Sequence, residues 1–567
     1  MLRLFFFGSW VSSFFLIFFS GLSADAQSLL ARGNVILING KSEKIEWSKW
    51  KKDNVTHFGI IDPGIANVLG IETLSNDLLE VQPAQWFSST MQFPVLFDNP
   101  YRYLDITELL QNSSTDCQIS GDNLILKVPP AQITHVEHQD KSIELSLDSK
   151  IFWQIKQNYQ QAIITLTGIP TSEVLNTLNK SLDNSATFQT QGTSSQITIN
   201  LPPGYSVRAS GLTHPYRLLI ELRPDNIQSK TIKWQPGISW HQDYITLADG
   251  SIFPVVYLEI DPKVSLTILK SIFAKPNGMV GISSVSKMNR SQGAIAGING
   301  GYFDRKIQQP LGAIKRDGSW LSNPILNRGV IAWNDNGDFS LGRLNWQENL
   351  SNQQGIKISV VALNSGFYKA GVTRYTQDWG SIYTPITDNE KVFLVENKII
   401  KQEIFLDIDK LPIQIHENNY LLVLRDQDNP SLKLGTQLEV LDQFFPDIFH
   451  DYSNLLGAGP LLVQDGKIIL DPKIENFQPA FQKEHASRSA IATTFNGTFL
   501  LIVTHKRLQG QGANLQEFAE LMQKLGAQNA LNLDGGSSSS LYLGGQSIDN
   551  PSKEPAKVNN GLSIFLK

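Results

Sequence analysis

The sequence predicts an α+β protein, mainly antiparallel sheet with packed helices in its C-terminal half, preceded by small β-rich N-terminal domains. Three features predict it: tight-turn dipeptides between short β-rich runs, one amphipathic helical stretch, and an apolar run that ends at a glycine turn. Asn-Gly and Asp-Gly pairs suit the positive φ angles of two-residue hairpin turns. These pairs are Asn39-Gly40, Asp249-Gly250, Asp317-Gly318, Asp465-Gly466 and Asn496-Gly497.

The first 26 residues have the layout of a secretory signal peptide. Arg3 precedes an apolar run from Leu4 to Leu22, and Ser23-Ala24-Asp25-Ala26 provides an Ala-x-Ala cleavage site, which predicts a mature start at Gln27. The alternative is an uncleaved membrane anchor, since the run is nearly long enough to span a bilayer. No later stretch is apolar for long enough to cross a membrane. We therefore expect an exported protein in the periplasm, the cell envelope or the extracellular space.

A mature chain of this length predicts several domains, at about 150 residues each. We divide it near Pro224 to Gly237, where proline and glycine clusters interrupt both helix and sheet. Residues 27–127 and 128–230 are expected to be two small β-rich domains, and residues 237–567 form the C-terminal domain.

Charge and cysteine content exclude some classes of protein. The 48 Lys+Arg and 53 Asp+Glu give a formal net charge of -5 without a long run of one sign, so nothing indicates a nucleic-acid partner. The single cysteine, Cys117, cannot form an internal disulfide. A buried structural cysteine is expected, because no partner motif supports the alternative of a nucleophile.

One helix is expected from Asn514 to Leu525. Apolar residues recur on one face, Asn514 and Glu517 have the spacing of a capping box, and Gly526 follows the end. The helix leads into a buried strand, Ala530 to Leu533, which ends at the glycine turn.

The segment from Ala294 to Asp304 brings an amide, two glycines, two aromatics and a carboxylate together on a small-residue strand. Gly300 and Gly301 allow close approach of the backbone to a ligand, and the polar groups of Asn299 and Asp304 can bond hydroxyls. The alternative is an ordinary turn, since Asn-Gly-Gly is common turn chemistry.

A second segment, Ala530 to Leu541, contains Asp534-Gly535-Gly536 and then four serines. Because apolar residues flank the serines, we expect a loop inside the fold rather than a flexible linker. Backbone N–H groups of a glycine turn can form an anion-binding nest, with serine hydroxyls beside the carboxylate. This arrangement suits a phosphate-bearing ligand.

Together with the stretches between them, these segments resemble the phosphodiester glycosidase family from Trp240 to the C-terminus. The matching stretches are Pro254-Val255, Leu258–Asp261, Asn299–Asp304, Gly312–Gly318, Gly457–Leu461, Asp465–Lys467, Ser487–Ala492, Gly512-Ala513, Leu515–Ala519, Leu525–Ala527, Ala530–Ser540 and Val558–Asn560. The resemblance implies a hydrolase that cleaves the bond between a sugar anomeric carbon and a phosphodiester, releasing free sugar and a phosphomonoester.

The N-terminal segments show weaker resemblances. Tyr101–Leu110 with Leu124–Lys127 is similar to the copper amine oxidase-like N-terminal domain, which implies no copper here. Ile143–Leu147 with Tyr216–Leu222 is similar to the envelope-targeting AMIN domain. The alternative for both is a β-rich spacer.

Two positions depart from the family pattern. Members often carry Val-Asp-Gly-Arg where this chain has Val503-Thr504-His505-Lys506-Arg507, and the usual late arginine before the asparagine is replaced around Lys557. His505 is either a functional substitute or a surface or packing residue.

Cleavage at a sugar carbon requires stabilisation of positive charge on the ring and of negative charge on the departing phosphate. Asp534 is expected to stabilise the ring or activate water, with Asp304 as the second carboxylate and Arg488 as the phosphate clamp. The alternatives are structural: Asp534 capping its own turn, and Arg488 pairing with a carboxylate. The expected substrate-binding residues are Asn299, Gly300, Gly301, Asn532, Gly535, Gly536, Ser537 and Asn560. Lys315, Arg316 and Arg328 either add to an anionic subsite or are simply solvated.

The sequence indicates no required cofactor. Carboxylate and amide oxygens can bind calcium or magnesium, but no metal-binding loop is recognisable, so metal use is left open. The expected partner is a phosphate-linked glycan such as a cell-wall or envelope polysaccharide. Two other functions compete: a non-enzymatic envelope glycan-binding protein using the same pocket, and a hydrolase of ordinary glycosides.

Overall fold

The structure is a computed structural model. It describes residues 28–158, 160–175, 186–224, 227–276, 278–366, 369–409, 411–507, 510–549 and 556–567. The predicted signal peptide lies outside these residues. Within them, no helix is both long and apolar enough to cross a bilayer.

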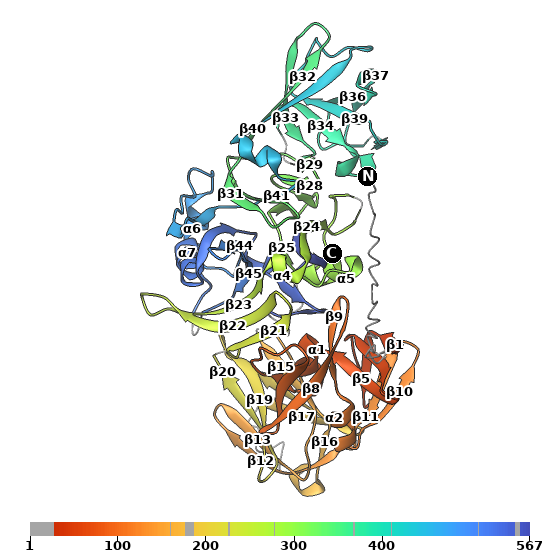
Figure 1. The fold of residues 1–567 in the computed structure, drawn as a ribbon, viewed down its shortest axis with the longest axis vertical. Helices are drawn as coiled ribbons and strands as arrows, with labels where there is room; N and C mark the ends of the chain where they lie inside the picture. The colour runs from red at the N-terminus through yellow and green to blue at the C-terminus, as the bar shows by residue number, and fades with distance from the viewer. Residues whose placement is uncertain are drawn as a thin grey trace, which may run out of the picture.

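The molecule is elongated, with an N-terminal part at one end, a central body and a further lobe at the other end (Figure 1). Among the described residues, strands make up 53% and helices 11%, so this part of the protein is mostly β and its helices are few. The predicted antiparallel sheets are confirmed, and all five Asn-Gly or Asp-Gly pairs connect antiparallel neighbours. At Asn39, Asp317 and Asp465 both turn residues have positive φ, as a two-residue type I′ turn requires.

Four sheets build the N-terminal part. The first contains β1 (Ser28–Gly33), β4 (Trp47–Lys52), β5 (Val55–Ile61), β9 (Tyr101–Asp105), β8 (Ser89–Asp98), β7 (Val81–Trp86) and β6 (Glu72–Thr73). The second contains β10 (Asp116–Ser120), β11 (Asn123–Lys127), β2 (Val35–Ile38) and β3 (Lys41–Glu43). The third contains β16 (Gly168–Pro170), β12 (Ala131–Gln139), β13 (Ser142–Leu147), β20 (Arg217–Arg223) and β19 (Ser206–Leu212). The fourth contains β14 (Trp153–Gln157), β15 (Gln161–Leu166), β18 (Ser194–Asn200) and β17 (Ala186–Gln191).

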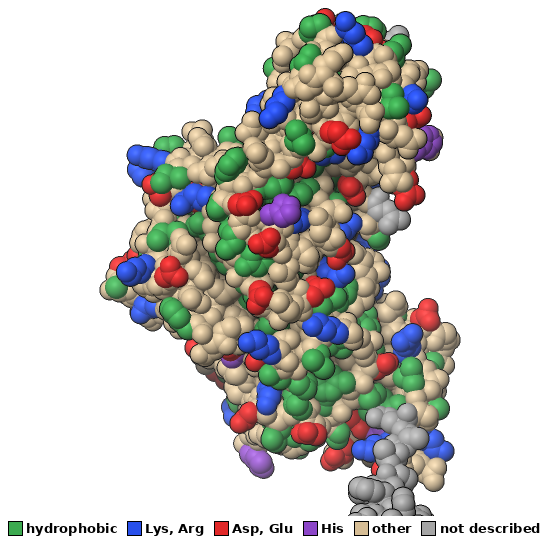
Figure 2. All heavy atoms as spheres, turned by 45° about the horizontal axis from the view of Figure 1, so that its top comes forward, with side chains coloured by type: hydrophobic (Ala, Val, Ile, Leu, Met, Phe, Trp, Pro, Cys, Tyr) green, Lys and Arg blue, Asp and Glu red, His purple; other side chains and the backbone are tan. Residues whose placement is uncertain are grey.

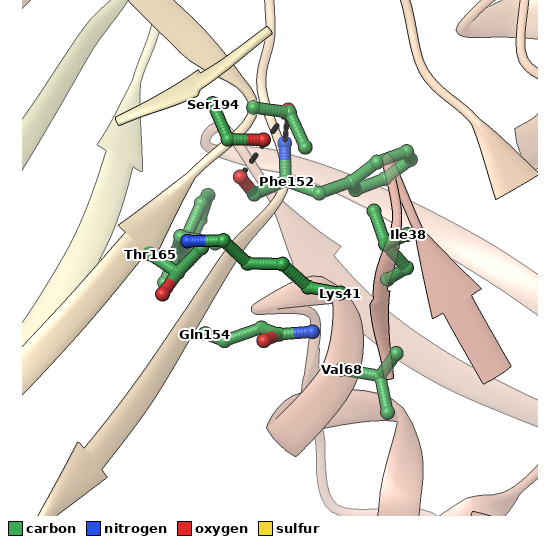
Figure 3. Close-up of a pocket in the computed structure, with 9 residues that line it drawn as sticks. Ile38, Lys41, Val68, Phe152, Gln154, Thr165 and Ser194 are labelled. Atoms are coloured by element: carbon green, nitrogen blue, oxygen red, sulfur yellow. Dashed lines mark hydrogen bonds between the residues drawn. The ribbon is translucent and has the colours of Figure 1, made fainter. Parts of the chain in front are cut away.

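One continuous cluster of buried hydrophobic side chains, from Ile36 to Ile220, joins these sheets. Figure 3 shows a small pocket within it, where Ile38 and Val68 lie across from Phe152. The Phe152 N–H donates to Thr167 Oγ1 at 2.9 Å. The two expected N-terminal domains therefore share a core, and their family resemblances stay predictions. Cys117 is partly buried against this cluster, and burial raises the pKa of its thiol to about 12.

The central body is built from three sheets and a small hairpin. The largest contains β21 (Lys230–Gln235), β22 (Ile238–Thr246), β23 (Ile252–Ile260), β45 (Phe499–Thr504), β44 (Arg488–Thr494), β46 (Ala527–Asn532), β42 (Leu461–Gln464) and β43 (Lys467–Ile468). The second contains β24 (Thr267–Phe273), β49 (Asn560–Leu566), β25 (Ala296–Asn299), β47 (Leu541–Leu543) and β48 (Gln546–Ser547). The third contains β29 (Ser319–Ser322), β28 (Ile314–Arg316), β41 (Asn454–Gly457), β30 (Gly329–Trp333) and β31 (Phe339–Arg343), and the hairpin pairs β26 (Phe303–Asp304) with β27 (Gln309–Pro310). Part of the expected linker, Lys230–Gln235, is thus a strand of the central body.

The further lobe is one sheet with a short added ladder. The sheet contains β37 (Ile399–Leu406), β36 (Glu390–Glu396), β39 (Tyr420–Arg425), β34 (Gly371–Thr376), β33 (Lys357–Leu363), β32 (Asn345–Asn352) and β40 (Leu438–Phe445). The ladder pairs β35 (Ile382–Tyr383) with β38 (Ile413–Gln414). Because β32 and β40 pair along their whole length, from Asn345↔Phe445 to Asn352↔Leu438, the chain enters and leaves the lobe side by side.

The described helices are short and lie mostly against sheets. They are α1 (Asp62–Leu69), α2 (Thr107–Asn112), α4 (Pro262–Ser265), α5 (Val285–Gln292), α6 (Pro479–Lys483) and α7 (Leu515–Lys524), with single 3-10 turns η1 (Gln377–Trp379), η2 (Asp447–Asp451) and η3 (Gly536–Ser538). The predicted C-terminal helix is confirmed as α7, with the Asn514–Glu517 capping box present. Its apolar face packs on the large central sheet, whose opposite face covers the second sheet.

The face of the molecule in Figure 2 has no large patch of one charge sign. Figure 2 shows lysine and arginine side chains interspersed with aspartate and glutamate over the visible face. This distribution agrees with the nearly balanced composition.

Candidate active site

Asn299 ends β25, between strands β47 and β49, and its side chain is completely buried. Its Nδ2 donates to the Asp534 carbonyl at 2.6 Å, and its Oδ1 accepts from Ser489 Oγ at 2.8 Å and from Ser540 N at 3.1 Å. All these bonds are internal. Asn299 therefore fixes the two predicted segments to each other, and sugar binding by its side chain stays a prediction that these contacts do not favour.

Gly300 and Gly301 lie where side chains have no room. A Cβ on Gly300 would overlap Asn560 Oδ1, and one on Gly301 would overlap the Gly457 carbonyl oxygen. Asn560 is buried, and its Oδ1 accepts from Gly301 N at 2.8 Å. The close packing of the protein itself thus explains these glycines and Asn560.

Asp534 lies just after β46, at the start of the glycine turn. Its backbone N–H donates to the Gly300 carbonyl at 3.0 Å, and its Oδ1 accepts from Gly535 N at 3.0 Å. Burial raises the pKa of this carboxyl group, while the Ser538 hydroxyl, the Gly535 N–H and the Arg305 charge lower it. Asp534 therefore caps its own turn and is also a perturbed, half-buried carboxylate, which is typical of functional sites.

Tyr302 is the point at which charged groups converge. Burial raises its pKa most, the charge of Asp534 raises it further, and the charges of Arg328 and Arg488 lower it. Its hydroxyl donates to the Gly459 carbonyl at 2.7 Å, and the Arg328 guanidinium lies 5.2 Å from its ring centroid. Two carboxylates, Asp534 and Glu475, and two arginines from distant segments thus act on a single tyrosine.

Two phenylalanines complete an aromatic cluster beside Tyr302. Phe477 and Phe481 stack with ring centroids 5.1 Å apart, and the Tyr302 ring lies 5.7 Å from Phe477. Arg328 covers Phe477 at 4.3 Å, and Arg488 covers Phe481 at 5.3 Å. The two guanidinium groups are therefore held by aromatic faces on both sides of the cluster.

Arg488 begins β44 and is buried. Its Nε donates to the Ala513 carbonyl at 3.0 Å and its Nη2 to the Glu484 carbonyl, so backbone oxygens, not a carboxylate, hold it. Burial lowers its pKa, and the charges of Tyr302 and Glu484 raise it. Its Nη1 lies beside Gly535, within 3.7 Å of where a Cβ would stand. That nitrogen points the charge toward the glycine turn.

The Asp304 carboxylate accepts hydrogen bonds from the backbone of its own turn. Its Oδ1 accepts from Lys306 N at 2.7 Å and from Ile307 N at 3.1 Å. This turn presents Arg305, whose Nη2 donates to Ser537 Oγ at 3.3 Å and whose charge acts on Asp534. The structure thus assigns Asp304 a local hydrogen-bonding role and places Arg305, an exposed cation, next to the turn.

Asn532 retains one free polar atom. Its Nδ2 donates to Tyr302 Oη at 3.0 Å, to the Gly459 carbonyl at 2.9 Å and to the Leu533 carbonyl at 2.8 Å. Its Oδ1 is buried and has no hydrogen-bond partner among the described residues. Gly536 has φ +62 and open space where a Cβ would stand, and Ser537 is exposed.

The three other basic residues expected near the first segment do not lie together. Arg328 lies at Tyr302, whereas Lys315 donates to the His450 carbonyl at 2.8 Å and Arg316 covers Phe273 at 5.4 Å. Across the described ranges, no group of three or more His, Cys, Asp or Glu residues has an arrangement that could hold a metal ion.

Sequence reasoning missed Arg305, Phe477 and Phe481, and it left the role of His505 open. Arg305 carried a signal, because it directly follows the first motif. The two phenylalanines lie in a stretch that no motif covers. His505 bonds Ser487 and Asp549, which no local pattern connects.

The fold and this site define a mostly β protein whose C-terminal part carries a phosphodiester glycosidase family domain, matched over residues 358–565. In solved structures, the chain is similar to a hypothetical protein from Synechocystis, with 37% identity and a TM-score of 0.89 over 95% of this chain and 100% of that chain. The chain belongs to the same family as this Synechocystis protein. The zebrafish N-acetylglucosamine-1-phosphodiester alpha-N-acetylglucosaminidase catalytic domain shares 17% identity over 59% of this chain and 85% of that chain, with a TM-score of 0.33. A comparison with curated proteins gives no match.

Proposed function

We propose that the chain is an exported hydrolase that cleaves the bond between a sugar anomeric carbon and a phosphodiester. The products are free sugar and a phosphomonoester. The observation that carries the proposal is geometric: Arg328 lies 5.2 Å from the Tyr302 ring centroid and Arg488 Nη1 lies beside Gly535, next to Asp534, inside a chain with a phosphodiester glycosidase domain. A phosphate-linked envelope or extracellular polysaccharide is the proposed substrate class.

The leaving phosphate is bound by cations at the glycine turn. Arg488 Nη1 lies beside Gly535, and Arg305 contacts Ser537, so two guanidinium groups approach the turn from different segments. Guanidinium forks match phosphate oxygens and stabilise the charge that develops as the bond breaks. Phosphate is already a good leaving group, so this clamp replaces a strong general acid.

The sugar lies on the Asp534 side of the site. In its ionised form, Asp534 stabilises the oxocarbenium-like ring or activates the attacking water. The unpartnered Oδ1 of Asn532 accepts a hydrogen bond from a sugar hydroxyl. Because the pKa of Asp534 is raised by burial, turnover falls with acid through a range above the ordinary value of 3.8.

The test is a time course with an aryl phosphodiester of N-acetylglucosamine 1-phosphate, reading free sugar and phosphomonoester together. We expect equal release of both from the wild type and loss of both in Asp534→Asn. Asp471→Asn is the matched control, because Asp471 is likewise a half-buried carboxylate that accepts turn N–H groups, here from Lys473 and Ile474, but lies outside the glycine turn. Full turnover by Asp534→Asn would remove Asp534 from the mechanism.

A non-enzymatic glycan-phosphate binding protein is the second candidate. The internal bonds of Asp304, Asn299 and Asn560 favour it, because they leave fewer free polar groups for chemistry. Saturable binding of a glycan phosphate without release of either product would select this function. Sugar release from a phosphate-free glycoside at the same rate would instead indicate an ordinary glycosidase.

A further inference from the structure

Ser487, His505 and Asp549 form a continuous hydrogen-bonded chain at one end of the large central sheet. Ser487 Oγ lies 3.0 Å from His505 Nδ1, and His505 Nε2 lies 2.9 Å from Asp549 Oδ2. Strand register explains the first contact: Arg488 pairs with Thr504 across β44 and β45, so the residues flanking that pair meet just beyond the strands.

The environment of Asp549 fixes the proton on the histidine. Asp549 is buried, and its Oδ1 accepts from Leu541 N at 2.8 Å and from Ser547 Oγ at 2.8 Å. An ionised carboxylate only accepts hydrogen bonds, so its Oδ2 requires a proton on His505 Nε2. His505 Nδ1 then carries the lone pair and accepts from the Ser487 hydroxyl.

Ser487, the serine of this hydrogen-bonded series, is placed to react with a ligand. Ser487 is half-buried, and the His505 side chain is 18% exposed, so neither is sealed in the core. The Ser487 carbonyl accepts from Gly536 N at 2.7 Å, which places Ser487 directly against the glycine turn. A hydroxyl hydrogen-bonded to a histidine that a carboxylate orients has the three roles of an activated nucleophile.

We propose that Ser487, His505 and Asp549 are a nucleophilic relay that hydrolyses carboxylic esters of the O-acyl type. Ser487 Oγ attacks the ester carbonyl carbon while its proton passes to His505 Nδ1. The bond to the leaving alcohol breaks, and the alcohol takes the proton from His505. Water then attacks the acyl-serine with His505 as base, which frees the carboxylic acid and restores Ser487. This activity is separate from the phosphodiester cleavage and does not require it.

The first experiment treats the full chain with an alkyl fluorophosphonate, locates the adduct by peptide mass spectrometry, and measures hydrolysis of 4-nitrophenyl butyrate. We expect the adduct on Ser487 and none in Ser487→Ala. Ser229→Ala is the matched control, because Ser229 is an exposed serine of the central body whose hydroxyl donates to the Asp243 carboxylate, not to a histidine. Ser229→Ala should label and turn over ester as the wild type does.

Asp549→Asn separates a reactive relay from a structural brace. The amide oxygen still accepts from Leu541 N and Ser547, so melting should stay near wild type, but the amide N–H now faces Nε2 and forces the proton onto Nδ1. Labelling and ester hydrolysis should then fall by roughly 10⁴-fold. No adduct on Ser487, adduct formation unaffected by Asp549→Asn, or an adduct without ester turnover above Ser487→Ala would each overturn the proposal.

Discussion

Replacing Asn299 by alanine tests whether this residue connects the two halves of the site or binds sugar. The change removes three bonds, to the Asp534 carbonyl, the Ser489 hydroxyl and the Ser540 N–H, in a completely buried position. At about 1 kcal/mol for each bond, the loss is about 3 kcal/mol, and orphaned buried groups add to it. A change of 1 kcal/mol lowers the melting temperature of a body of this size by about 2–4 °C, so the melting temperature of the central body should fall by about 6–12 °C.

Scanning calorimetry measures this effect, with Asn529→Ala as the control. Asn529 lies on β46, the strand that leads to Asp534, and makes two bonds, to Thr493 Oγ1 at 3.2 Å and from Asp465 N at 3.1 Å. It is half-buried, so water replaces those bonds and the loss should stay below about 1 kcal/mol. If Asn299→Ala melts like the wild type but no longer binds substrate, Asn299 contacts the sugar and the connecting role is wrong.

Three further predictions follow from buried groups. Burial raises the pKa of Asp534 in the folded protein above 3.8. Asp534→Asn should therefore match the wild type in thermal stability below pH 3.8 and exceed it increasingly as the pH rises through the folded-state pKa. A variant that is less stable than the wild type at neutral pH would contradict this. Gly301→Ala should lose folding yield and turnover, because its Cβ overlaps the Gly457 carbonyl oxygen. Gly536→Ala has open space for its Cβ, so its positive φ should lower the free energy of unfolding by only about 1–2 kcal/mol. Equal urea midpoints for the two variants would refute the steric argument. Arg425→Met leaves the buried Glu390 without its ion-pair partner at 2.7 Å, so the lobe should lose about 3–5 kcal/mol of stability. The lobe should then become sensitive to limited proteolysis while turnover in the central body persists. Unchanged proteolytic cleavage would show that the pair is dispensable.

The parts of the fold that depend on residues adjacent in the sequence were predictable from the sequence. The hairpin at Asp317-Gly318 follows from φ preference, and helix α7 follows from its capping box and apolar face. Strand pairing across the chain was not predictable, because β25 lies between β47 and β49, whose residues come more than 240 positions later. Alternation of side chains along a strand carries no information about which strand pairs with it.

The site was predictable in composition but not in roles. Asn299 and Asp534 were expected in one site, and a hydrogen bond joins them in the structure, while their roles in that site stay predictions. An amide that bonds the protein and one that bonds a ligand look the same in a sequence, so the internal bonds of Asn299 and Asn560 had no local signal. The same limit applies to Ser487, His505 and Asp549, which meet only because three loops end at one edge.

The chain enters and leaves the lobe between β32 and β40 at one place. The end of β33 also bonds the central body, where Leu363 N donates to Asn323 Oδ1 at 2.8 Å and Asn364 Nδ2 to the Leu321 carbonyl at 2.9 Å. The lobe's first and last paired residues, Asn345 and Phe445, are cross-strand neighbours, about 4.5–5.5 Å apart between their Cα atoms. A two-residue turn can close that gap, so a hairpin can replace the lobe in the chain. The two bonds at the end of β33 that such a replacement removes are made at β29, whereas Asp534 and Arg488 lie at β46 and β44. A change in the size of the lobe therefore acts through these bonds on β29 rather than directly on β44 and β46.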